Sequence, residues 1–170
     1  MVSENKLTLD ILPLSADTAR LVRVYGTAPC VVLPAVLPAP EGGSFAVTEL
    51  GGYCFSEKPR SLPASDKTCR YTVEPDGTVR LTRAFGQAVD GTCRRYDFDF
   101  DAPASDADTL HPVCGNFLEE VTLPDSLQVI GSCAFYNCRS LRLLTVGSGS
   151  LIVGSDVFLN CFALETIRVQ

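Results

Sequence analysis

A 23-residue repeat occupies the C-terminal part of the chain and constrains its fold more than any other feature. From Leu118 onward, a shift of 23 positions aligns apolar residue with apolar residue and needs no insertion or deletion. The aligned sets are Leu118–Leu141–Leu164, Val121–Leu144–Ile167, Leu123–Val146–Val169, Ile130–Val153, Gly131–Gly154, Phe135–Phe158, Asn137–Asn160 and Cys138–Cys161. One such unit cannot bury its own apolar face, so the repeat predicts coils that stack on one another.

Each coil is predicted to contain a strand, a turn and a short helical turn. In LEEVTLP, residues 118–124, inward Val121 and Leu123 alternate with outward residues, and Pro124 ends the strand. The segment SCAFYNC is long enough for one or two helical turns, with Ser132 as the cap. We expect parallel strands at residues 119–123, 142–146 and 165–169. We also expect a buried set: Ile130, Phe135, Leu141, Leu144, Val153 and Phe158.

A degenerate earlier copy lies in residues 21–56. It aligns with the later repeat if about ten residues are inserted after Leu33-Pro34. Leu33-Pro34 then corresponds to Leu123-Pro124, Leu50-Gly51 to Ile130-Gly131, and Phe55 to Phe135. Cys54 takes the place of Ala134, which indicates a cysteine used as a small core residue.

The motif L-x-x-V-x-L-P-x-S-L-x-x-I-G-x-x-A-F-x-N-C-x-S-L resembles the BspA-like class of bacterial leucine-rich repeats, closely in residues 118–169 and loosely in residues 21–56. The chain departs from it at Gly147, at Val157 and in a long middle insertion. The resemblance implies an α/β repeat fold: a right-handed solenoid with a strand and a short helical turn in each coil. The resemblance also implies that the protein binds other macromolecules and does not act as a catalyst.

Stacked strands would form one sheet whose outward side chains make a candidate binding surface. Its predicted residues are Glu120, Thr122, Leu143, Thr145, Thr166 and Arg168. In leucine-rich repeats this surface commonly receives ligands. The alternative is a sheet face that is only solvated.

The cysteines Cys138 and Cys161 recur at one position of the repeat, whereas Cys133 is replaced by Asp156 one coil later. A set of metal ligands would not be half replaced, so the favoured interpretation is a column of reduced, buried thiols without metal. A metal site and a regulatory thiol are the alternatives.

The rest of the chain does not follow the repeat. We divide it into cap strands with a degenerate first repeat (residues 1–56), a β-hairpin insertion with a loop (57–112), and the repeat coils (113–170). YTVEPDGTVRL predicts an antiparallel hairpin around Pro75-Asp76-Gly77. The segments KLTLDILPL and RLVRVYG predict strands that cap the first coil. The chain ends after a strand, and no capping sequence follows that strand. This favours the interpretation that the chain is a fragment of a longer protein.

Other candidate sites carry weaker signals. Asp97, Asp99 and Asp101 alternate along one strand face, which is typical of a solvated face; a cation site is the alternative. The single histidine, His111, lies beside Pro112 with no nucleophile motif. The glycines of GSGSLIVG fall inside the repeat and lack the Lys-Ser/Thr of a phosphate loop. The sequence therefore predicts neither enzyme activity, nor a metal, nor a cofactor.

Charge and the N-terminus narrow the class of partner and the location. The net charge of −6 argues against nucleic acid, and no run of residues has the length of a membrane span. No signal peptide is visible, which predicts a cytoplasmic protein; the family resemblance suggests the cell surface instead.

We expect a non-catalytic protein-interaction module with an unknown protein partner. The alternative is a structural segment of a larger repeat protein. The open C-terminal coil suggests self-association.

Overall fold

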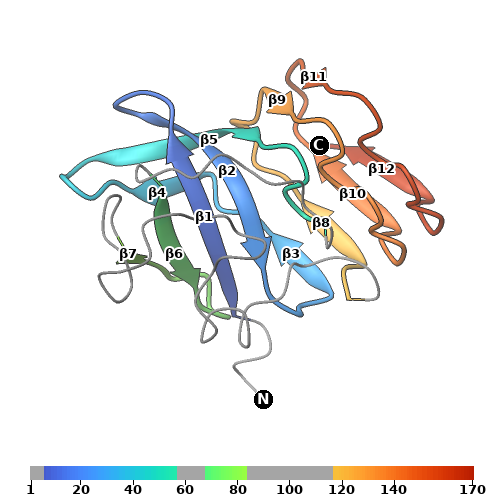
Figure 1. Ribbon diagram of the computed structural model, residues 1–170, viewed down its shortest axis with the longest axis horizontal. Helices are drawn as coiled ribbons and strands as arrows, with labels where there is room; N and C mark the ends of the chain where they lie inside the picture. Colours follow the sequence, from blue (N-terminus) through green and yellow to red (C-terminus); the bar gives the residue numbers. More distant parts are fainter. Residues whose placement is uncertain (1–5, 57–67, 84–116) are drawn as a thin grey trace.

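The computed structural model describes residues 6–56, 68–83 and 117–170 (Figure 1). In these ranges it contains twelve strands and no helix. The strands are β1 (Leu7–Pro13), β2 (Thr18–Tyr25), β3 (Cys30–Val32), β4 (Val36–Pro38), β5 (Ser44–Leu50), β6 (Cys69–Val73), β7 (Val79–Arg83), β8 (Glu120–Thr122), β9 (Val129–Ile130), β10 (Leu143–Val146), β11 (Ile152–Val153) and β12 (Thr166–Val169).

One side of the solenoid is a four-stranded sheet in the order β12-β10-β8-β3, visible as adjacent arrows in Figure 1. All its pairs are parallel, and the 23-residue offset sets the register: Val121 lies opposite Leu144, and Leu144 opposite Ile167. The three strands expected from the repeat are therefore confirmed. The fourth, β3, places Val31 opposite Val121.

The degenerate copy is confirmed as the first coil. β5 pairs in parallel with β9, with Leu50 opposite Ile130, and β9 pairs in parallel with β11. The Leu33 amide donates to the Thr122 carbonyl, as the Leu123 amide does to the Thr145 carbonyl in the next coil. The ten extra residues after Leu33-Pro34 are accommodated by β4, which folds back antiparallel on β5.

The third side of each coil consists of turns, so the expected helical turn is wrong. Cys133 and Asn137 have φ values of 60° and 64°, which a right-handed helix excludes. Amide donors also alternate along this segment. Ala134, Tyr136 and Cys138 donate to carbonyls three residues back, whereas Cys133, Phe135 and Asn137 donate to the next coil. A helix would direct all of these amides along its own axis, so they would not alternate between the segment itself and the neighbouring coil.

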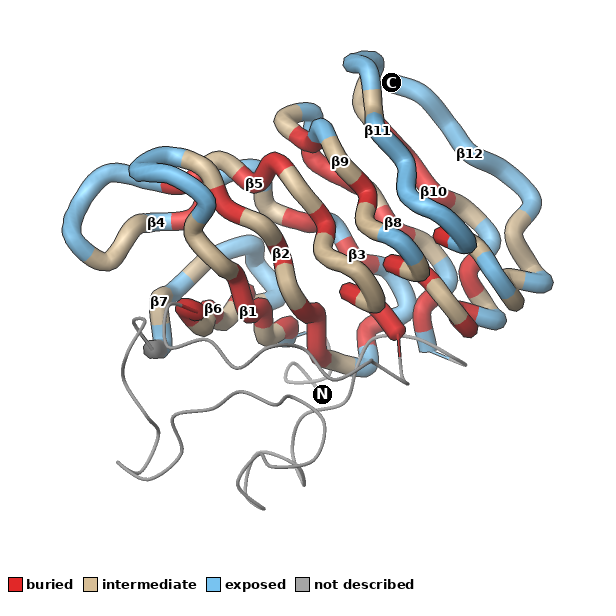
Figure 2. Tube along the Cα trace, turned by 45° about the horizontal axis from the view of Figure 1, so that its top comes forward, coloured by how far each residue is buried: buried red, intermediate tan, exposed pale blue. Residues whose placement is uncertain are grey.

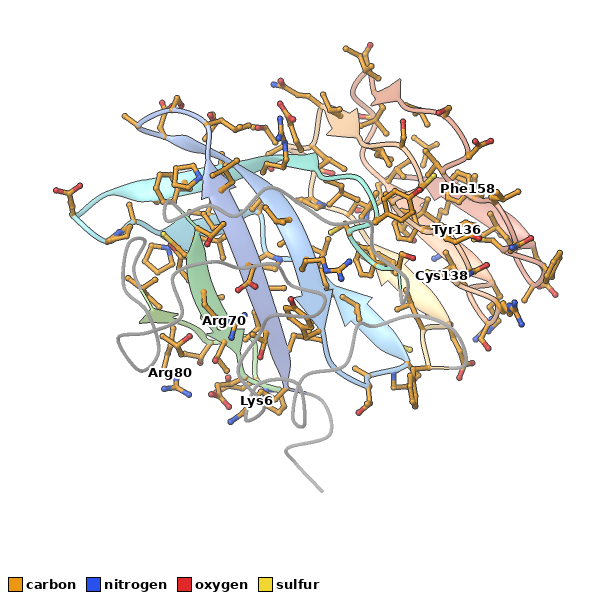
Figure 3. All side chains as sticks on the ribbon, viewed as in Figure 1. Lys6, Arg70, Arg80, Tyr136, Cys138 and Phe158 are labelled. Atoms are coloured by element: carbon orange, nitrogen blue, oxygen red, sulfur yellow. The ribbon has the colours of Figure 1, made fainter. Side chains whose placement is uncertain are left out.

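The N-terminal strands extend the sheet that contains β5 and β9. β2 pairs in parallel with β5, β1 antiparallel with β2, and β6 antiparallel with β1. The hairpin predicted around Pro75-Asp76-Gly77 is confirmed as β6–β7, and Gly77 has a φ of 93°. Figure 3 shows Lys6 and Arg80 at this end of the molecule, where both side chains pair with Glu74.

A buried ion pair joins β1 to β6. Asp10 has no exposed surface, and its two carboxylate oxygens accept bonds of 2.7 and 2.9 Å from the Arg70 guanidinium. The guanidinium carbon lies 5.7 Å from the centroid of the Tyr25 ring. Burial, and then the charge of Asp10, raises the pKa of Tyr25 well above its usual value. A break in this pair would leave a buried charge uncompensated, which is strongly destabilising.

Burial follows the predicted pattern except in the last coil. Ile130, Phe135, Leu141 and Leu144 are buried, as expected. Phe158 is only partly buried, and Val153 is exposed, contrary to the prediction. Both belong to the coil that begins with β10. The described residues supply no further coil to cover them. Figure 2 shows this gradient as the change from red to pale blue toward β11 and β12.

The described residues bear only in part on the three-part division of the chain. The predicted row of Asp97, Asp99 and Asp101 lies outside them, as do His111 and most of residues 57–112. The division at residues 56 and 112 stays a prediction. β6, within the predicted insertion, pairs directly with β1 of the predicted cap.

Candidate binding face

The outward side chains of β3, β8, β10 and β12 form what we call the strand face. The register aligns them in two rows across the coils: Cys30, Glu120, Leu143 and Thr166 in the first, and Val32, Thr122, Thr145 and Arg168 in the second. The parallel ladder therefore brings the six residues predicted from the sequence onto one surface. Whether that surface binds a ligand stays a prediction.

Exposure differs along the face. Thr166 and Arg168 on β12 are exposed, whereas Glu120, Thr122 and Leu143 are partly buried. Thr145 is only 6% exposed, although its side chain belongs to the outward row. It lies between Thr122 and Arg168 on the neighbouring strands, and a small side chain flanked on both sides has little surface left.

The first coil adds two residues to the face that the sequence reasoning missed. Cys30 is exposed, and Val32 has 68% of its surface exposed. The signal was available, because the alignment of Leu33-Pro34 with Leu123-Pro124 places both residues at outward positions of the strand. Together with Leu143 they give the face an apolar component beside its polar and charged residues.

Charges cluster beside β8 and β10, the two inner strands of the face. The Arg142 guanidinium lies 2.6 Å from a Glu120 carboxylate oxygen and 3.7 Å from one of Glu119. Arg142 and Glu119 are exposed and Glu120 is about one-third exposed, so the pairs contribute little to stability. The pKa of the nearby Cys30 thiol is raised, first by desolvation and then by the charges of Glu120 and Glu119. This thiol is therefore a poor nucleophile near neutral pH.

The cysteine column lies inside the coils and away from the strand face. The Cys161 thiol lies 3.0 Å from the Phe135 carbonyl oxygen, and the Cys138 thiol lies 3.7 Å from the Phe55 carbonyl oxygen. Figure 3 labels Cys138 and Phe158 among the side chains of this region. Burial raises the pKa of Cys161 to about 11 and that of Cys54 to about 12. The thiols of Cys138 and Cys161 thus each bond to the preceding coil.

Within the described residues, no three or more His, Cys, Asp or Glu side chains come together to hold a metal ion. The same residues include no helix with the length and hydropathy needed to cross a membrane. The strand face is thus a sheet surface of mixed polarity.

A family model described as "BspA type leucine rich repeat region (6 copies)" matches residues 113–170. These residues are BspA-type leucine-rich repeats. Their Asn and Cys columns are the left-handed turn position and the thiol contacts described above. In their Phe column, the rings of Phe135 and Phe158 are stacked. The first coil, residues 30–56, lies outside the match but stacks on the BspA-type coils in the same register.

A solved structure shares this fold. It is a leucine-rich cell surface protein from Faecalibacterium prausnitzii, with a TM-score of 0.52 and 18% sequence identity. The match covers 95% of this chain and 30% of that protein. The chain therefore spans less than a third of the length of this neighbour. Among curated proteins none matches the chain.

Proposed function

We propose that the strand face of these repeats is a non-catalytic docking surface for a protein partner. The observation that carries the proposal is the exposure of Val32 on a regular sheet face that also carries Leu143 and the Arg142–Glu120 pair. Contiguous apolar patches rimmed by polar residues are typical of protein interaction sites. Leucine-rich repeats commonly mediate protein interactions, which supports this use of the fold.

The cell surface is the location that we propose with this function. Support comes from the fold neighbour, which is described as a cell surface protein. No observation supports the cytoplasmic location that we expected from the sequence. A structural role within a longer stack of coils is the second candidate, and the apolar exposure of the last coil favours it.

A comparison of two valine substitutions tests the docking surface. Val32 and Val36 are exposed to similar extents, 68% and 54%, but only Val32 lies on the strand face. The wild-type chain is coupled to a sensor surface and screened against purified surface proteins from the organism that encodes it. A binder found in this way should lose at least about tenfold in affinity for Val32→Asp and keep it for Val36→Asp.

Equal binding by all three chains would place the contact elsewhere and refute the assignment to the strand face. Equal loss in both variants would do the same. Equal melting temperatures for the two variants would show that folding does not account for a difference.

A further inference from the structure

The turn segments of the coils are joined by a hydrogen-bond ladder that has a fixed direction. In the second coil, the amides of Cys133, Phe135 and Asn137 donate to carbonyls of the third coil. In the first coil, the amides of Tyr53 and Phe55 donate in the same way to carbonyls of the second coil. Each coil therefore directs amides toward the coil that follows it and carbonyls toward the coil that precedes it.

The outer side of the first coil is the carbonyl end of this ladder. The accepting carbonyls of the third coil belong to Ser155, Val157 and Leu159. Their counterparts in the first coil are those of Gly52, Cys54 and Ser56. Cys54 and Ser56 are buried, and a buried carbonyl needs a hydrogen-bond donor. Only a group that donates hydrogen bonds fits at this end of the ladder.

Strand β2, which lies beside the first coil in Figure 1 and pairs with its strand β5, supplies such donors. The Val24 amide donates to the Cys54 carbonyl at 3.2 Å. The Arg23 guanidinium donates to the Ser56 carbonyl at 3.3 Å and to the Tyr53 carbonyl at 2.9 Å. The carbonyls of Cys54 and Ser56 thus accept from a strand that is not itself part of a coil.

The turn of the first coil also keeps the backbone geometry of the later turns. Tyr53 has a φ of 59°, and its counterparts Cys133 and Asp156 have φ values of 60° and 56°. This left-handed region is unfavourable for a bulky side chain and persists only where surrounding contacts hold it. The bond from Arg23 to the Tyr53 carbonyl is such a contact.

We propose that Arg23 is the cap of the turn ladder and that its guanidinium takes the place of the amides of a preceding coil. A guanidinium has five N–H donors and no acceptor, which matches an end that presents carbonyls. Its burial requires compensation by hydrogen bonds and opposite charge. Asp10, which is also buried, lies directly opposite Arg23 on β1.

The cap has a consequence for assembly, because solenoids are stable only with closed ends. Another coil, from a second copy or from a different repeat protein, would have to compete with β2 for the carbonyls of Cys54 and Ser56. The turn side of the first coil is therefore a closed end of the stack. This assignment does not depend on the proposed docking function of the strand face.

Hydrogen exchange in two lysine variants tests the cap. Arg23→Lys keeps the positive charge but loses the planar fork of donors. It should accelerate exchange of the Phe55 amide by about tenfold or more relative to that of the Phe135 amide, one coil further along. Arg70→Lys is the matched control, since Arg70 binds the Asp10 carboxylate from β6. It should leave the ratio of these two exchange rates as in the wild type.

A measurement on the wild type keeps the proposal testable if Arg23→Lys fails to fold. By NMR, a scalar coupling should connect the Arg23 Nη1 atom with the Tyr53 carbonyl carbon across their hydrogen bond. A guanidinium that rotates freely and shows no such coupling would overturn the proposal. So would an unchanged ratio of Phe55 to Phe135 exchange in Arg23→Lys, or an equal change of that ratio in Arg70→Lys.

Discussion

Phe135 lies in the middle of a column of three rings. Its ring is stacked 4.8 Å from that of Phe55 and 5.7 Å from that of Phe158, measured between centroids, and its side chain is fully buried. Phe135→Ala should lower the free energy of unfolding by about 3–5 kcal/mol, because it removes a core aromatic and leaves a cavity. Urea denaturation measures the loss.

Phe162→Ala is the matched control for that substitution, since Phe162 occupies the same region of the last coil but is 77% exposed. It should change stability by no more than about 0.5 kcal/mol. Similar losses in the two variants would contradict a stacked core.

The thiols should react in the order of their burial. Cys30 is exposed, whereas Cys54 and Cys138 are buried and Cys161 is partly buried with a pKa of about 11. Alkylation at about pH 8, followed by peptide mapping, should label Cys30 first and leave Cys138 unlabelled until the protein is denatured. Rapid native labelling of Cys138, or stoichiometric zinc in the purified protein, would contradict the structural role of the column.

These raised thiol pKa values also set the direction of an alkaline effect. The unfolded chain loses the Cys54 proton near the ordinary pKa of 9.0, whereas the folded protein holds it to about 12. The unfolded state therefore binds fewer protons between these values, and the free energy of unfolding should fall as the pH rises through that range. Denaturation midpoints measured across it check the sign; for Cys54→Ala the fall should be smaller.

Asn137 and Asn160 illustrate what the sequence could and could not predict at the residue scale. Their recurrence was visible, but their cause is backbone geometry: φ values of 64° and 66°, which asparagine tolerates better than most residues. The Asn160 amide also donates to the Asn137 side-chain oxygen at 2.7 Å. The segment length alone favoured a helix, which the positive φ values and the alternating amide donors exclude.

Coil spacing is the property that matters at the level of elements, and Gly131 limits it. A Cβ at Gly131 would lie 2.6 Å from the Gly52 amide nitrogen, so Gly131→Ala must push the first two coils apart. It should cost about 1–3 kcal/mol of stability, the usual range for overpacking. Gly149→Ala, with nothing within 4 Å of the added atom, is the control and should be nearly neutral. Thermal melts of the two variants measure the difference in stability. Equal melting temperatures would argue against close stacking at Gly131.

The elements were predictable wherever the repeat fixed their register. The strands at β8, β10 and β12 follow from one offset, and the hairpin β6–β7 follows from its turn residues. The burial of Thr145 was not predictable, because it depends on which side chains flank it on adjacent strands. The return strand β4 was not predicted either, since an insertion of apolar residues and prolines carries no period of its own.

The two ends of the whole molecule differ. At the N-terminal end, β2 and β1 continue the sheet beyond the first coil and β6 pairs with β1. At the other end, the described residues leave β11 and β12 exposed. The stack therefore grows less buried from the first coil to the last. The coverage of the first coil was expected from the N-terminal strand patterns, whereas the exposure of Val153 was missed because the repeat pattern is the same in every coil.

The central claim is that the first coil, although about 80 to 90 residues away in sequence, stacks in parallel on the BspA-type repeats. Scalar couplings across hydrogen bonds test it directly by NMR. We predict a coupling between the Leu33 amide nitrogen and the Thr122 carbonyl carbon, matched by one between Leu123 and Thr145. A spectrum with the second coupling but not the first, or with Leu33 coupled to a different carbonyl, would contradict the account.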